Sequence, residues 1–225
     1  MSRSILNVIF TTLLFVLLAA LPLPARAQEN LRAQLFGGAD SLLVRVKERK
    51  ADLLAPASYK RAMRYYNDAL EDFKKGGNLE DMREKVQNAS VYFAKALDVA
   101  KIGEVAFSSS LAARTDALSA GAPTQQPELW KKADDKFNRA AAELEDGDMG
   151  SGNKLGAEAA ELYRRAELES IKSNYLSPAR ILIDKATKMG ADETAPKTLA
   201  RARQPAPQTE ALLKLNRYAT DEARE

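Results

Sequence analysis

Residues 56–77 read PASYKRAMRYYNDALEDFKKGG and decide the fold. Large and small apolar residues alternate along this stretch at spacings of 3, 4, 3 and 4. Such a spacing places them on one seam of an α-helix that packs beside a nearly parallel or antiparallel neighbour. The proline suits the first turn of the helix and the glycines suit its end. The predicted seam consists of Tyr59, Ala62, Tyr66, Ala69 and Phe73.

The same pattern returns without a gap from Pro127, which corresponds to Pro56. A third start at Pro196 follows after a nearly equal interval. Self-similarity at a fixed period, here about 70 residues, indicates a repeat architecture. We predict repeats over 56–126, 127–195 and an incomplete 196–225. Aromatic faces can also line a groove for a peptide or a glycan, but the heptad spacing favours packing. The seam of the second repeat consists of Trp130, Ala133, Phe137, Ala140 and Leu144.

A longer helix is predicted after each short one, from Leu79 to about Ser119 and from about Asn153 to Lys188. Gly103 falls on the seam of the first, so we interpret it as a close-contact residue and not as a break. Pro178 lies inside the second and should kink or interrupt it. The two predicted seams are Met82, Val86, Ala89, Phe93, Ala96, Ala100, Gly103 and Phe107, and Tyr163, Ala166, Ser170 and Ser173.

Helix lengths suggest how these segments pack. A short helix of about 20 residues spans about 30 Å and covers only half of a helix of about 40 residues. The other half is most simply covered by the short helix of the next repeat. We therefore predict an all-α fold, an elongated antiparallel coiled coil or helical-repeat rod. The competing arrangement folds each long helix back, at Gly103 and at Pro178, into a compact bundle.

The N-terminus has the order of a secretory signal. An early cation, Arg3, precedes an apolar run, and Ala25-Arg26-Ala27 forms a small-residue cleavage site. We predict a signal peptide at 1–27, a linker at 28–38 and a helical repeat domain at 39–225; an uncleaved anchor is the alternative. Cleavage lowers the net charge from +3 to +1, because two arginines and no acids are removed. This balance does not favour nucleic-acid binding. With the signal removed and no lipobox cysteine to carry an acyl anchor, we expect no stable membrane insertion of the mature chain.

The chain contains no cysteine and no histidine. An exported protein of this kind has no disulfide framework, and the usual zinc, copper and haem ligands are missing, so we expect no cofactor. The commonest general base is also missing, and no pair of carboxylates stands out, so we expect no enzyme. The segment 146–153 superficially resembles a calcium loop, but Gly150 and Ala157 stand where ligands belong. A helix-to-helix turn is the preferred interpretation.

The first repeat resembles the helical, alanine-rich domain of unknown function found in proteobacterial envelope proteins, where it usually precedes an OmpA-like peptidoglycan-binding domain. The resemblance covers most of 39–225 and implies residence in the periplasm near the outer membrane or the cell wall. Two departures stand out: residues 204–207 interrupt the third repeat, and no OmpA-like segment follows. We expect either a truncated product or a partner of a separate wall-binding protein. The resemblance rests on Pro56, the seam from Tyr59 to Phe73, Gly76, Asn78-Leu79, Tyr92-Phe93 and Ala96.

The expected function is therefore that of a non-catalytic envelope spacer or scaffold, with an envelope protein or peptidoglycan as its partner. A tetratricopeptide-like adaptor is the alternative, because Tyr59 and Phe93 are separated by the period of that repeat, about 34 residues, as are Ala62 and Ala96. That fold needs a turn within every period. The stretch from Leu79 to Ser119 offers only Gly103 as a turn, so the adaptor ranks second.

Overall fold

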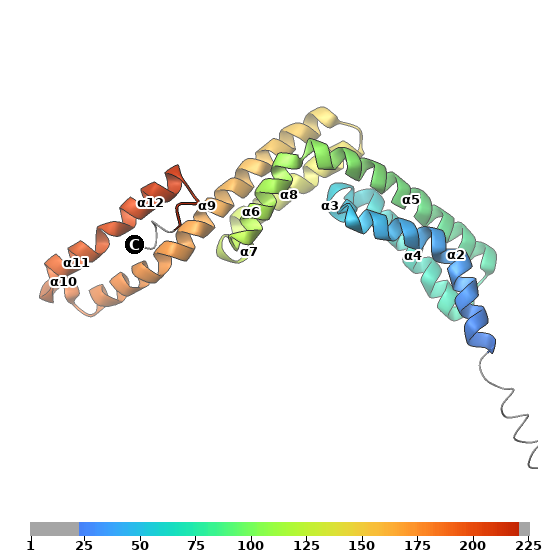
Figure 1. Cartoon of the computed structure of the whole chain (residues 1–225), viewed down its shortest axis with the longest axis horizontal. Helices are drawn as coiled ribbons and strands as arrows, with labels where there is room; N and C mark the ends of the chain where they lie inside the picture. The colour runs from blue at the N-terminus through green and yellow to red at the C-terminus, as the bar shows by residue number, and fades with distance from the viewer. Residues whose placement is uncertain (1–22, 221–225) are drawn as a thin grey trace, which may run out of the picture. The chain divides into compact units, whose positions relative to one another are not determined.

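The computed structural model describes residues 23–220, all of whose regular elements are helices (Figure 1). The predicted signal peptide at 1–27 lies outside the described residues except for 23–27, which begin the first helix. The helices are α2 (Leu23–Glu48), α3 (Ala51–Leu54), α4 (Pro56–Lys75), α5 (Leu79–Ala106), α6 (Ser108–Ser119), α7 (Ala122–Gln125), α8 (Pro127–Glu145), α9 (Met149–Lys188), α10 (Ala191–Thr194), α11 (Pro196–Arg203) and α12 (Pro205–Leu215).

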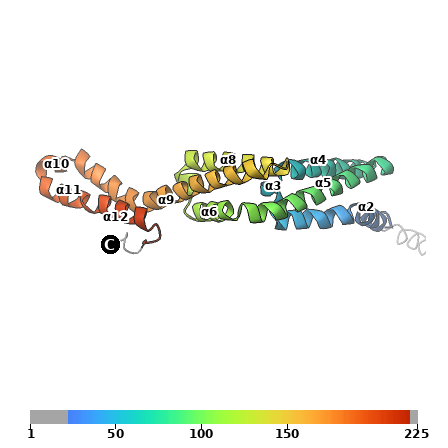
Figure 2. The ribbon, with the colours of Figure 1, turned by 90° about the horizontal axis from the view of Figure 1, so that it is seen from above.

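These helices form two compact units. The first consists of the described part of Met1–Glu48 together with Ser58–Lys95, so that α2, α4 and the first part of α5 lie side by side (Figure 2). The second consists of Arg49–Ala57 and Ala96–Glu225. In it α9 packs against α6 and α8 with its first part and against α10, α11 and α12 with its last part. Each unit therefore has its own core.

Every repeat opens with the same backbone turn. A left-handed residue precedes a four-residue helix: Lys50 (φ 50°), Gly121 (φ 78°) and Gly190 (φ 79°). The residue after that helix is extended, with φ between −135° and −144°, because the proline that follows excludes the helical conformation there. That proline then begins α4, α8 or α11 at a position where no N–H is needed. The period seen in the sequence is thus also a structural period.

Two predicted segments differ from the structure near the N-terminus and in the first long helix. Residues 28–38, predicted as a linker, belong to α2, because Phe36 is fully buried and holds them in the fold. The predicted continuous helix 79–119 is interrupted at Phe107, whose φ of −108° and ψ of 19° separate α5 from α6. Gly103 stays helical: a Cβ there would lie 3.2 Å from Leu54 Cδ2, which confirms its close-contact role.

The second long helix also differs in detail. It begins at Met149, four residues before the predicted start, because Asp148 accepts a hydrogen bond from the backbone N–H of Ser151 and caps it. It continues through Pro178, so the interruption predicted there does not occur. Pro178 costs the helix one backbone hydrogen bond, and the packing of α9 against neighbouring helices offsets this loss. The predicted interruption of the third repeat is confirmed, since Gln204 separates α11 from α12.

Candidate functional site

The predicted seam residues lie in the cores of the two units. Tyr59, Phe73 and Trp130 are half-buried, and the other seven are buried: Ala62, Tyr66, Ala69, Ala133, Phe137, Ala140 and Leu144. The predicted seams of the long helices are buried as well, apart from half-buried Ser173. These side chains pack against one another and do not line an open groove.

In the first unit the aromatic residues of three helices form one cluster. Phe36 of α2 meets Tyr66 of α4 edge to face, with ring centroids 5.8 Å apart. Tyr66 in turn meets Phe93 of α5 at 6.1 Å, and Tyr59 meets Phe93 at 6.4 Å. Each such pair adds about 0.5–1.5 kcal/mol to the effect of burial. The cluster therefore ties α2, α4 and α5 together.

The second unit repeats this cluster one period later. Phe107 and Phe137 meet at 5.5 Å, Phe137 and Tyr163 at 6.4 Å, and Trp130 and Tyr163 at 5.2 Å. Phe107 also lies against Gly156, where an added Cβ would come within 2.8 Å of its ring. The interruption of the helix at Phe107 accompanies this tight contact between α6 and α9.

A tyrosine hydroxyl in each cluster is held by an aspartate. Tyr66 donates a hydrogen bond to Asp40 of α2, and Tyr163 donates one to Asp134 of α8. Burial, followed by the bond to Asp40, raises the pKa of Tyr66 to about 12. Burial and the bond to Asp134 raise the pKa of Tyr163 further above its ordinary value. Both phenols stay protonated at neutral pH and act as structural donors.

The segment 146–153 forms the predicted turn. Gly147 follows α8 in a left-handed conformation, with a φ of 91°. The Asp148 carboxylate accepts hydrogen bonds from both the backbone N–H and the hydroxyl of Ser151. These two bonds lower the pKa of Asp148. Its oxygens are thus used to cap α9. Among the described residues, no group of three or more acidic side chains is arranged to hold a metal ion.

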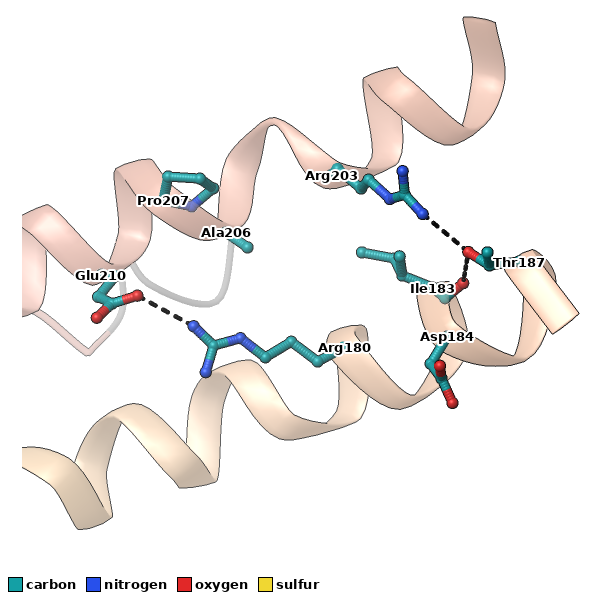
Figure 3. A pocket seen from close by; sticks show the side chains of 8 residues that line it. All are labelled: Arg180, Ile183, Asp184, Thr187, Arg203, Ala206, Pro207 and Glu210. Atoms are coloured by element: carbon teal, nitrogen blue, oxygen red, sulfur yellow. Dashed lines mark hydrogen bonds and ion pairs between the residues drawn. The ribbon is translucent and has the colours of Figure 1, made fainter. Parts of the chain in front are cut away.

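A concave surface of the second unit lies between the last part of α9 and the helices α11 and α12 (Figure 3). It is a shallow groove of about 400 Å³. Arg180 crosses it to Glu210 at 3.0 Å, and Arg203 donates to the Thr187 hydroxyl at 2.9 Å. Asp184 turns away from it (Figure 3). The other lining residues are Ile183, Ala206 and Pro207.

Two buried charges extend this contact along α9. Glu167 is only 1% exposed and accepts from Arg217 at 2.7 Å and from the Tyr218 hydroxyl at 3.0 Å. Lys172 is 5% exposed; its ammonium donates to Glu169 of α9 at 2.8 Å and lies 3.8 Å from Glu210 of α12. A buried charge is tolerated only when it is paired, and part of this pairing comes from the segment after α11. The network therefore fastens α12 and residues 216–219 to α9.

The charged groups of the groove and of its extension along α9 pair with one another. Arg180 bonds to Glu210 and Arg203 bonds to Thr187 in the groove, and Lys172 lies near Glu210 farther along α9. None of the described helices is both long enough and apolar enough to cross a membrane.

Comparisons with family models, curated proteins and solved structures gave no match for this chain. The resemblance to the alanine-rich envelope domain therefore rests on the residues quoted for it and stays a prediction.

Sequence reasoning missed the turn that opens each repeat and the network around Glu167. The turn has a signal that could have been found, since Ala51, Ala122 and Ala191 each stand five residues before a proline. The network has none, because its partners lie far apart in the sequence and each looks like an ordinary surface charge.

Proposed function

We propose that this protein is a non-catalytic scaffold or spacer of the bacterial periplasm that works beside the outer membrane or the peptidoglycan. The observation that carries this proposal is the aromatic cluster that recurs one period apart, at Phe36, Tyr66 and Phe93 and again at Phe107, Phe137 and Tyr163. Proteins built from stacked repeats of one packing unit present extended surfaces to partners.

The proposal includes an elongated arrangement of the repeats. The support is local: in the second unit the first part of α9 packs on its own short helix α8, and its last part packs on the next ones, α11 and α12. If the same rule holds from repeat to repeat, each period adds about 30 Å of length. An elongated molecule of this kind bridges or spaces partners instead of enclosing a substrate.

The predicted signal peptide supports the periplasmic part of the proposal. The order of an early cation, an apolar run and an Ala-x-Ala triplet at residues 1–27 is that of a cleaved signal. The adaptor alternative has weaker support. A tetratricopeptide needs a turn in roughly every 34 residues. By contrast, α9 continues for 40 residues without one.

Small-angle scattering on the mature monomer tests the shape. A compact domain of about 200 residues has a radius of gyration near 16–17 Å, and the proposed rod should clearly exceed it. Oligomers must be separated first, since two molecules end to end would imitate a rod. A value at the compact limit would reject the spacer.

Mass spectrometry of the periplasmic and membrane fractions tests the location. We expect a periplasmic protein that begins at Gln28. A chain that keeps Met1 in the membrane fraction would contradict export and cleavage.

A further inference from the structure

The second and third repeats can be compared residue by residue within the second unit. Gly121 and Gly190 are both left-handed, and α6 and α9 end two residues before them in the same way. Pro127 and Pro196 begin α8 and α11 six residues after these glycines. A shift of one period, which carries Gly121 onto Gly190, therefore superimposes the register of α6 and α8 on that of the end of α9 and α11.

In the second repeat a third helix covers this pair. The first part of α9 packs against both α6 and α8. As a result Ala113 and Ala117 of α6 and Ala133 of α8 are fully buried. The covering helix is fixed by an ion pair between Arg164 and Asp116 of α6, and its Tyr163 hydroxyl bonds to Asp134 of α8.

In the third repeat the equivalent surface is open in the described part of the chain. Leu182, which corresponds to Ala113, is 66% exposed, and Ala202, which corresponds to Ala133, is exposed as well. Met189 extends the apolar strip at 76% exposure. We call this surface, formed by Leu182, Lys185, Ala186, Met189, Ala202 and Arg203, the third-repeat seat.

The charges of the third-repeat seat are opposite to those of its counterpart. Where the second repeat has Asp116 and Asp134, the third has Lys185 and Arg203, of which Arg203 donates to Thr187 in the groove. A helix with the sequence of α9 would bring Arg164 against Lys185, and like charges disfavour association. The seat therefore disfavours a second copy of α9. It favours a helix that carries a carboxylate at the position of Arg164.

We propose that the third-repeat seat binds an acidic amphipathic α-helix of a partner protein, in the position that the first part of α9 occupies in the second repeat. The helix lays an apolar face on Leu182 and Ala202 and a carboxylate on Lys185. Helix-in-groove binding of this type needs anchors at helical spacing and a charged rim. The inference names the partner of the scaffold, and in that sense it rests on the proposed function.

A charge-swap experiment on the full mature protein tests the proposal. Two labelled peptides serve as probes, residues 149–168 of this chain and the same peptide with Arg164→Glu. Fluorescence anisotropy with each peptide gives the affinity for the wild-type protein and for Lys185→Asp. We expect the wild-type protein to prefer the acidic peptide by about two- to fivefold, as one exposed ion pair allows, and Lys185→Asp to reverse the preference.

Two further variants keep the outcome decisive. Leu182→Glu should abolish binding of the acidic peptide without changing the thermal melt, because the side chain is exposed. Ile181 is also exposed, and it corresponds to Ala112 of α6, which α9 leaves uncovered; Ile181→Glu should therefore leave binding unchanged. No binding of the acidic peptide at millimolar concentration, or a preference that Lys185→Asp does not reverse, would overturn the proposal.

The oligomeric state of the protein distinguishes a partner helix in the seat from a second copy of this chain. A dimer of the wild-type protein that Leu182→Glu turns into a monomer would show that a second copy fills the seat, and this would also overturn the proposal. Neither outcome depends on the radius of gyration or on the cell fraction, so failure here is distinguishable from failure of the spacer function.

Discussion

Ala133 and Ala202 stand at the same place in two repeats, yet one is fully buried and the other is exposed. Both lie six residues after a proline that begins a helix, and the preceding turns are alike. What differs is the neighbour, since α9 covers Ala133 and no described helix covers Ala202 in the same way. Local sequence thus determines the helix and its turn, while burial is determined by the segment that arrives from elsewhere.

The strongest test of this comparison is a glutamate at each alanine. Ala133→Glu places an unpaired charge and extra volume in a packed core, which should cost roughly 3–5 kcal/mol of unfolding free energy. Ala202→Glu should change it by less than about 0.5 kcal/mol, as surface substitutions do. Thermal and urea melts followed by circular dichroism measure both. Similar losses at the two sites would mean that the third repeat is covered in solution.

Two glycines of α9 allow the same comparison within one helix, since Gly156 lies against a buried side chain and Gly150 does not. Gly156→Ala should destabilise by about 1–3 kcal/mol, because its Cβ would press on the buried Phe107 ring at 2.8 Å. Gly150→Ala meets its nearest neighbour at an ordinary 3.4 Å and should stabilise the helix by up to about 1 kcal/mol. Urea denaturation gives both values. If Gly156→Ala stabilised the protein, the Phe107 ring would not lie against α9 as described.

The two helix caps provide a pH test with a built-in control. Asn78 caps α5 through the N–H of Glu80 at 2.8 Å, and Asp148 caps α9 through the N–H of Ser151 at 2.9 Å. Because the cap lowers the pKa of Asp148 in the folded state, its contribution is present above the unfolded pKa near 4 and disappears as the pH falls through the folded value.

Melting temperatures from pH 7 to pH 2 measure this effect. Asp148→Ala should lower the melting temperature at pH 7 and have a smaller effect at pH 2. Asn78→Ala should have an effect that does not follow this titration. A loss from Asp148→Ala that is independent of pH would show that the carboxylate does not cap α9 as an anion.

The smallest effect is expected from the tyrosines of the two clusters, since nothing changes at neutral pH. The raised pKa of Tyr66 and of Tyr163 means that stability is complete below the unfolded pKa near 10 and falls as the pH rises towards the folded values. Absorbance at alkaline pH should show both phenols ionising after exposed tyrosines. Tyr66→Phe should remove a late step near pH 12; a titration unchanged by it would contradict the Asp40 contact.

Much of the helix pattern was predictable because heptad spacing is a local property. The burial of Ala62, Tyr66 and Phe93 follows from their positions on single helices. The break at Phe107 was not predictable from the local pattern, and the residue that the Phe107 ring packs against, Gly156, lies much later in the chain. The third-repeat seat was not predictable either. Its charges can be compared with those of the second repeat only after the end of α9 has been aligned with α6.

The turn that opens each repeat has a consequence for how such a chain can be built. Its bonds close within the turn, as from the N–H of Gln126 to the carbonyl of Ala122 at 2.8 Å and from that of Ala195 to Ala191 at 3.0 Å. A segment cut between two equivalent glycines, residues 122–190, begins directly after one left-handed glycine and ends on the next one. It is therefore a cassette that a gene duplication or an engineer could insert in tandem with the same backbone junction, provided that an acidic residue replaces Lys185 to receive Arg164 of the next copy.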